Sequence, residues 1–115
     1  MSMEPKHSAA AIIPCNDLDE SQAFYERLGF AVTADYPFHG YRILHDPRGA
    51  SLHLTRTEPG WAVPERNAYG LYFYSDDVEQ LAATFGCAAQ RMPWGLREFA
   101  VSDPNGTLVR VGWPG

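Results

Sequence analysis

The sequence predicts an α+β fold of two tandem βαβββ modules that form curved mixed sheets. One turn signature occurs twice, as Asp-Pro-Arg-Gly at residues 46–49 and, about half a chain length later, as Asp-Pro-Asn-Gly at residues 103–106. In both copies apolar residues follow at alternate positions, which is typical of a strand with one buried face. Two copies indicate a duplicated module, because a solenoid needs at least about three repeats.

The length of 115 residues favours one domain over residues 1–115. A chain of this size buries roughly 65% of the surface that its unfolded form exposes. We expect module 1 at about residues 8–57, a linker at about 58–67, where Pro59, Gly60 and Pro64 gather, and module 2 at about 68–114.

In module 1, the apolar run at residues 9–15 predicts a buried strand. Asn16, Asp17 and Asp19 are candidates for the cap of a following helix, and Asp19-x-x-Gln22 has the spacing of a capping box. The helix is expected to end at Gly29, which is able to take the left-handed conformation. Further strands are expected at residues 30–36 and 41–45, and after the first turn.

In module 2, residues 69–74 have the aromatic and apolar composition of a strand. Ser75, Asp76 and Asp77 are expected to cap a helix that ends at Gly86. Residues 96–111 then predict a hairpin around the second turn. Each module alone is a sheet with one helix and an uncovered face, so we expect the two modules to pack together and two chains to associate.

Composition narrows the function classes. The net charge of −5 argues against a nucleic-acid partner and favours a cationic or neutral ligand, although such a charge also serves solubility alone. No segment is long and apolar enough to span a membrane, and the N-terminus lacks a secretory pattern. We expect a cytoplasmic protein, with Cys15 and Cys87 as reduced core residues.

Several segments resemble the vicinal-oxygen-chelate superfamily of glyoxalases, extradiol dioxygenases and bleomycin resistance proteins. Asp17-Leu18 and residues 23–30 (Ala-Phe-Tyr-Glu-Arg-Leu-Gly-Phe) are similar to its first-helix signature, and residues 103–106 to its last turn. Residues 63–67 and 93–100 resemble the bleomycin resistance branch specifically.

The resemblance implies where a metal would bind in an enzyme of this superfamily. The equivalent positions are similar to Ala10, His53, Gly70 and Arg110. Strand alternation independently sends His53 and Arg110 to the concave face, opposite the apolar residues around them. Of the four, only His53 is a metal ligand, and a catalytic site needs about three protein ligands. We therefore expect no metal, no cofactor and no catalytic residues.

Aromatic residues are expected to line the concave face instead. Tyr72 and Tyr74 share the alternation of Gly70, Trp94 lies on the loop before the last hairpin, and Tyr36 and Phe38 occupy the place where the family presents an aromatic residue. Two such rings hold a planar group between them. Each aromatic residue is alternatively a core residue. His53 and Arg110 are expected either to hydrogen-bond a polar ligand, such as a carboxylate or phosphate, or to be half-exposed without a role.

The resemblance implies a homodimer that sequesters a bleomycin-family glycopeptide without altering it and so confers resistance. In this family the two chains form shared clefts, and the N-terminal strand is in some cases exchanged. One alternative is a diverged glyoxalase- or dioxygenase-like enzyme that acts through His53 and Arg110. Another is a binder of a different aromatic metabolite, because fold alone does not fix the ligand.

Overall fold

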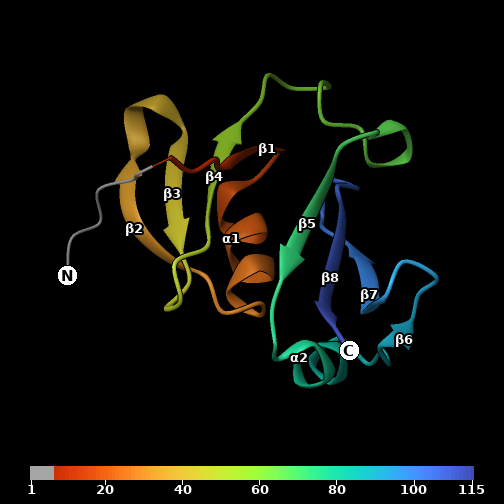
Figure 1. Ribbon diagram of the computed structural model, residues 1–115. Helices are drawn as coiled ribbons and strands as arrows, with labels where there is room; N and C mark the ends of the chain where they lie inside the picture. The colour runs from red at the N-terminus through yellow and green to blue at the C-terminus, as the bar shows by residue number, and fades with distance from the viewer. Residues whose placement is uncertain (1–6) are drawn as a thin grey trace.

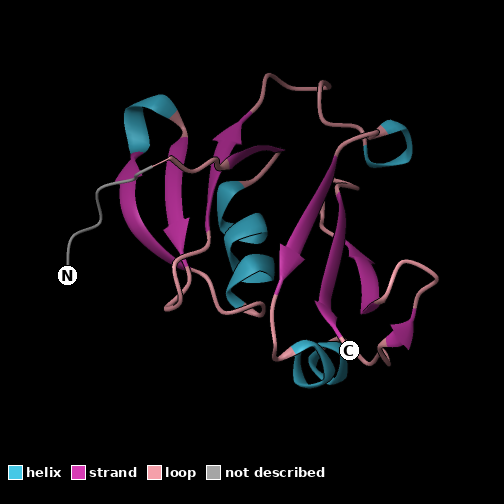
Figure 2. Ribbon diagram, in the orientation of Figure 1, coloured by secondary structure: helices cyan, strands magenta, loops and turns pink. Residues whose placement is uncertain are grey.

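The computed structural model describes residues 7–115, so the first six residues of the expected domain lie outside it. It contains two four-stranded sheets and two α-helices, and each sheet belongs to one half of the chain (Figures 1 and 2). This confirms the predicted α+β fold of two similar modules.

Module 1 forms the first sheet. Its elements are β1 (Ala11–Cys15), α1 (Leu18–Glu26), β2 (Ala31–Tyr36), the short 3₁₀ turn η1 (Pro37–His39), β3 (Tyr41–His45) and β4 (Ser51–Arg56). The strand order is β1-β4-β3-β2, and only the β1–β4 pair is parallel.

Module 2 repeats this topology. A segment that holds the 3₁₀ turn η2 (Pro64–Arg66) leads to β5 (Gly70–Tyr74), α2 (Val78–Thr84), β6 (Gln90–Arg91), β7 (Leu96–Ser102) and β8 (Leu108–Pro114). The strand order β5-β8-β7-β6 matches that of module 1, again with one parallel pair, β5–β8.

The two helices begin differently. Asp17 caps α1, because its Oδ1 accepts hydrogen bonds from the backbone N–H groups of Asp19 and Glu20 at 2.9 and 3.1 Å. The predicted capping box at Asp19 was therefore wrong. Asp77 precedes α2 but makes no capping bond. Asp76 and Asp77 instead form ion pairs with Arg48 of the first turn, where two nearby carboxylates attract the guanidinium.

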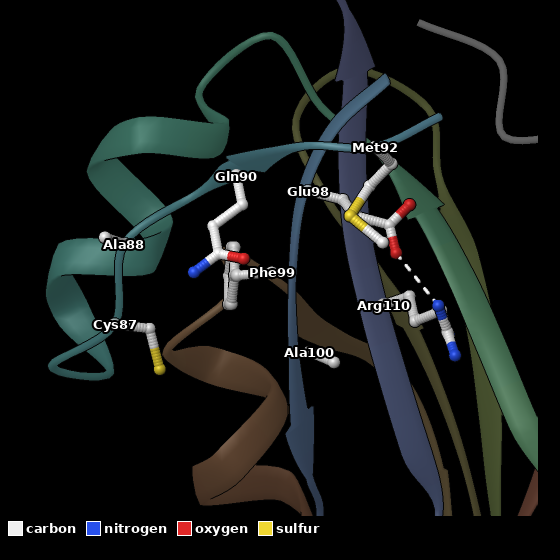
Figure 3. Close-up of a pocket in the computed structure, with 8 residues that line it drawn as sticks. All are labelled: Cys87, Ala88, Gln90, Met92, Glu98, Phe99, Ala100 and Arg110. Atoms are coloured by element: carbon white, nitrogen blue, oxygen red, sulfur yellow. Dashed lines mark hydrogen bonds and ion pairs between the residues drawn. The ribbon is translucent and has the colours of Figure 1, made fainter. Parts of the chain in front are cut away.

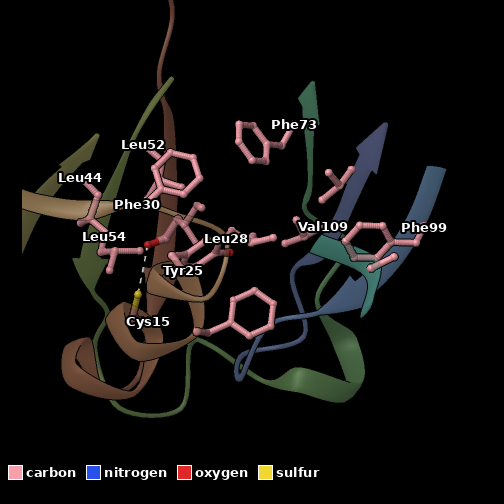
Figure 4. Close-up of a cluster of buried hydrophobic side chains, with 14 of the residues drawn as sticks. Cys15, Tyr25, Leu28, Phe30, Leu44, Leu52, Leu54, Phe73, Phe99 and Val109 are labelled. Carbon is pink, nitrogen blue, oxygen red and sulfur yellow. Dashed lines mark hydrogen bonds between the residues drawn. The ribbon is translucent and has the colours of Figure 1, made fainter. Parts of the chain in front are cut away.

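A shared hydrophobic core joins the modules, with α1 lying between the first sheet and the second module (Figures 1 and 4). The rings of Phe30 and Phe73 lie 5.1 Å apart, centre to centre. The alternating residues of β4 and β8 are completely buried in this core, as predicted: Leu52, Leu54, Val109 and Val111. The other face of each sheet, on which strand alternation places His53 and Arg110, therefore points away from the core. It is called the outer face below.

The second turn, at residues 103–106, connects module 2 to module 1 through hydrogen bonds to α1. Asp103 accepts a hydrogen bond from the Tyr25 hydroxyl at 2.8 Å, and the Asn105 amide donates to the Ser21 hydroxyl at 2.9 Å. Gly106 has a φ of +82°, and a Cβ there would collide with the backbone of Pro64. The turn is thus enclosed by α1 on one side and by the inter-module segment on the other.

The two cysteines have different environments. Cys15 is buried, as predicted, and burial raises the pKa of its thiol to about 11. Cys87 is exposed, so its assignment to the core was wrong. It follows Gly86, three residues beyond the end of α2, and its side chain lies at the surface. Within residues 7–115, neither helix has the length or apolar character needed to cross a membrane.

Candidate ligand-binding site

The outer face of the second sheet carries a cluster of polar side chains, called the Glu98 cluster: Tyr72, Trp94, Glu98 and Arg110. They come from β5, the loop before β7, β7 and β8. Arg110 lies between the buried Val109 and Val111, so alternation turns it outward. Tyr72 pairs with Arg110 in the parallel β5–β8 ladder. Neighbouring strands thus bring side chains that are distant in sequence to one place.

Glu98 is the centre of the cluster. Its Oε1 accepts hydrogen bonds from the Tyr72 hydroxyl and from the Trp94 indole N–H, both at 2.9 Å. Its Oε2 accepts from Nη1 of Arg110 at 3.0 Å. The Glu98 side chain is only 3% exposed, whereas that of Arg110 is 43% exposed. A buried carboxylate is stable only when it is paired and hydrogen-bonded, and here both oxygens have partners.

These contacts change the acidity of two groups. Burial alone would raise the pKa of Glu98, but the hydrogen bonds from Trp94, Tyr72 and Arg110 outweigh it and hold that pKa below its ordinary value. Burial, together with the hydrogen bond to Glu98, raises the pKa of Tyr72 to about 12. At neutral pH the Glu98 side chain is therefore a carboxylate and the Tyr72 side chain a neutral phenol.

Gly112 makes room for the Tyr72 ring. A Cβ at position 112 would overlap the Tyr72 hydroxyl. Gly112 lies opposite Glu98 in the β7–β8 ladder. Because Gly112 has no side chain, the Tyr72 side chain of β5 is able to cross β8 and reach Glu98 on β7. Glycine is required here for a close approach rather than for its backbone conformation.

Trp94 is both exposed and anchored. It lies in a tight turn in which Gly95 has a φ of +85° and donates its N–H to the Met92 carbonyl at 3.0 Å. The residue is 55% exposed, although its indole N–H is bound to Glu98. Trp94 therefore does not belong to the core, and part of its ring is accessible to a ligand.

A hollow of about 430 Å³ lies beside the cluster, with Gln90, Met92, Glu98, Ala100 and Arg110 in its lining (Figure 3). Trp94 and Tyr72 are not part of the lining and reach the hollow only through Glu98. The volume lies in the range typical of small-molecule pockets, and a charged guanidinium at the wall supplies hydrogen-bond donors.

Tyr74 borders the Glu98 cluster, because its ring contacts that of Tyr72, but it makes no hydrogen bond to Glu98. It is 60% exposed, and its ring centre is 4.7 Å from that of Tyr72. Both tyrosines line a second hollow of about 320 Å³, to which Phe30 and Ser51 of module 1 also contribute. Like Trp94, Tyr74 is therefore an exposed aromatic residue at the surface.

The remaining predicted residues belong to module 1. His53 lies on the outer face of the first sheet, where its Nδ1 is 2.6 Å from the Tyr41 hydroxyl. Tyr36 ends β2 and is half-exposed, and Phe38 in η1 is fully exposed. Because the outer faces of the two sheets point away from the shared core, His53 and Arg110 do not meet within one chain.

The residues do not fit the metal site that the superfamily's enzymes use. In the β1–β4 ladder the neighbour of His53 is Ile12, and Ala10 lies before β1. Neither side chain is a ligand, and Arg110 is cationic. Within residues 7–115 no three His, Cys, Asp or Glu side chains lie close enough together to hold an ion.

The sequence-based prediction missed Glu98 and Tyr41, which hydrogen-bond predicted site residues, and the lining residues Gln90, Met92 and Ala100. The hairpin offered a signal for Glu98, because its register places Ala100 opposite Arg110 and Glu98 on the diagonal of the same face. Tyr41 is likewise diagonal to His53, which pairs with Ile43. For Glu98 the available clue was its charge, which is opposite to that of Arg110 at the diagonal position of the predicted hairpin.

Two βαβββ modules, each a four-stranded mixed sheet with one helix, define the fold class of this chain. Consistent with this, residues 7–111 match the model of the Glyoxalase/Bleomycin resistance protein/Dioxygenase superfamily. The chain belongs to this superfamily. A comparison with curated proteins gives no significant match.

Solved structures similar to this chain include antibiotic-binding proteins. A bleomycin-binding protein in complex with bleomycin is 25% identical, with a TM-score of 0.80, over 96% of this chain and 100% of that protein. A bleomycin resistance determinant encoded on transposon Tn5 is 25% identical, with a TM-score of 0.81 and coverage of 95% and 98%. TnmS3, an antibiotic-binding protein from Streptomyces sp. CB03234, is 25% identical, with a TM-score of 0.75 and coverage of 97% and 100%.

Proposed function

We propose that the protein binds and sequesters a bleomycin-family glycopeptide antibiotic in the cytoplasm, without altering it, and so confers resistance. The observation that carries the proposal is the half-exposed ring of Trp94, whose indole N–H is bound to Glu98 in the wall of the hollow. The similarity to bleomycin-binding and other antibiotic-binding proteins supports it.

The chemistry of the site suits such a ligand. An accessible indole face stacks on a planar heteroaromatic group, which is worth about 0.5–1.5 kcal/mol beyond burial. The bithiazole of bleomycin is such a group, and the cationic tail of the drug suits a protein with a net charge of −5. Sequestration needs affinity but no acid, base or nucleophile.

A homodimer is the second part of the proposal. Each chain presents one outer face with Tyr36 and His53, next to the exposed Phe38 of η1, and another outer face with the Glu98 cluster. These two faces point in different directions. Two chains related by a two-fold axis would place the first face of one chain against the second face of the other and close two equivalent clefts. In the single chain β1 pairs with its own β4, and exchange of β1 would replace that pairing with an equivalent one.

Calorimetric titration with copper-loaded bleomycin tests the ligand. We expect submicromolar binding at one ligand per chain, and Trp94→Ala should weaken it about tenfold because the stacking surface is lost. Trp61→Ala is the matched control: Trp61 is 78% exposed but lies in the inter-module segment, and its removal should leave affinity unchanged. Equal affinities of both variants and the wild type would contradict the role of Trp94.

Light scattering at micromolar concentration tests the dimer. A mass equal to that of a single chain would contradict it.

A second candidate function is a diverged enzyme that acts on a small metabolite through His53 and Arg110. The close contact between His53 Nδ1 and the Tyr41 hydroxyl favours it, because a fixed imidazole is a suitable general base. Turnover of a metabolite that His53→Gln abolishes, with no bleomycin binding, would favour this function. Binding of a different aromatic natural product, without turnover, would keep the binding role and change the ligand.

A further inference from the structure

A charged side chain is almost completely buried beneath the half-exposed Trp94, and the proposed stacking on that ring does not explain it. An apolar residue at position 98 would avoid the cost of burying a carboxylate. We propose that Glu98 is a positioning residue, whose carboxylate fixes the Trp94 ring and the Arg110 guanidinium in the orientation that receives the ligand. The ligand part of this inference rests on the proposed function, whereas the positioning part is testable without ligand.

The first step concerns the Trp94 ring. A half-exposed tryptophan in a loop is free to change its side-chain rotamer unless a contact holds it. The indole N–H is the only polar group of the side chain, and it donates to Oε1 of Glu98 at 2.9 Å. That bond fixes one edge of the ring to β7 and leaves part of the ring open, since the residue remains 55% exposed. A ring that is already oriented loses less conformational entropy when a ligand stacks on it.

The second step concerns Arg110. Its guanidinium has five N–H donors, and Nη1 donates to Oε2 of Glu98. Across residues 7–115 this is the only hydrogen bond that the guanidinium makes, and the side chain is 43% exposed. The remaining donors are therefore available at the wall of the hollow. They would bind an acceptor of the ligand, such as a carbonyl or carboxylate oxygen, next to the group that stacks on Trp94.

The third step explains why the holding group is a carboxylate. Three donors converge on Glu98, and an ionised carboxylate offers acceptors only. A glutamine would keep the size and one oxygen, but it would turn an amide N–H₂ toward the Arg110 donor or toward the Trp94 donor. The variant Glu98→Gln therefore separates the effect of charge and acceptor number from the effect of packing.

The positioning of the ring is tested without ligand. In a chain with Trp61→Phe and Trp113→Phe, Trp94 supplies the only indole N–H, and its hydrogen exchange is measured by NMR. We expect Glu98→Ala to accelerate that exchange about tenfold or more, because the bond to a charged acceptor is lost. Glu98→Gln, which keeps one weaker acceptor, should give a smaller acceleration and serves if Glu98→Ala does not fold. Exchange that is unchanged in the folded variants would overturn the inference.

The ligand part is tested by titration of Glu98→Gln with copper-loaded bleomycin, with Glu79→Gln as the control. Glu79 also pairs with an arginine, Arg97, but lies on α2. We expect Glu98→Gln to lower affinity about tenfold, as for the loss of one charge-assisted hydrogen bond, and Glu79→Gln to leave it unchanged. Wild-type affinity in Glu98→Gln would overturn the inference. Wild-type protein that binds no bleomycin, with the exchange result as expected, would refute the proposed ligand and support the positioning of the ring.

Discussion

Asp46 and Asp103 accept the same backbone hydrogen bonds in the two turns but differ in their surroundings. Oδ1 of Asp46 and Oδ1 of Asp103 both accept backbone N–H bonds within their own turns, from residues two and four positions further on. Asp103 is only 4% exposed and also binds the Tyr25 hydroxyl. Burial, reinforced by the charge of Asp103 and the hydrogen bond to it, raises the pKa of Tyr25 above its ordinary value. The duplication thus provides a natural comparison of one residue in two environments.

We expect Asp103→Ala to reduce the free energy of unfolding by about 3 kcal/mol, because a buried tyrosine hydroxyl and two backbone N–H groups lose their acceptor. Asp46→Ala, in the first turn, should cost about 1 kcal/mol, since water replaces the lost acceptor there. Urea denaturation followed by circular dichroism measures both values. Similar losses in the two variants would show that enclosure of the second turn adds nothing to stability.

At the scale of elements, the two helices hold equivalent places and begin by different means. The side chain of Asp17 satisfies two N–H groups at the start of α1. At the start of α2, Asp77 binds Arg48 on the surface instead. A cap bond supports its own helix, whereas the ion pair ties a turn of module 1 to module 2.

Asp17→Ala should therefore destabilise the protein by about 1 kcal/mol, the usual value for loss of a helix cap. Asp77→Ala should cost less than Asp17→Ala, because an exposed ion pair contributes little in water. Thermal unfolding of both variants in the same buffer checks the difference. A larger loss for Asp77→Ala would mean that the contact between Arg48 and α2 stabilises the packing of the modules.

For the whole molecule, the Glu98 cluster links stability to pH. The pKa of Glu98 lies below its ordinary value of about 4.3 in the folded chain, so the unfolded chain binds the proton more readily. The stabilisation is present above about pH 4.3 and is lost as the pH falls through the folded-state pKa. We expect the urea midpoint of the wild type to fall between about pH 6 and about pH 3, and to fall less in Glu98→Gln.

Glu79→Gln is the control for this pH dependence. The hydrogen bond from Arg97 also lowers the pKa of Glu79, but the pair lies on the surface, where solvent weakens it. We expect this variant to retain the acid sensitivity of the wild type. Equal pH profiles for wild type and Glu98→Gln would show that Glu98 does not contribute to it.

The sequence alone determined the modular fold and the two faces of each strand. The repeated turn signature identified two modules, and alternation placed Val109 in the core and Arg110 outside, because in a strand successive side chains point to opposite faces. Trp94 and Phe38, which were predicted to line a ligand cleft, are exposed. Their roles in binding remain predictions.

Only the tertiary structure decided which polar groups meet. The Tyr25 hydroxyl reaches Asp103 across 78 positions, and Tyr72 reaches Glu98 across 26. Periodicity describes the local surroundings of a residue, whereas such pairs depend on how whole elements pack. Asp17 was among the predicted cap candidates, but the capping box at Asp19 was wrong, because several neighbouring polar residues are able to cap the same helix. The exposure of Cys87 was mispredicted because a surface segment without regular structure has no periodic pattern in the sequence. The sequence determined the faces, and the packing of the two modules decided the contacts made on them.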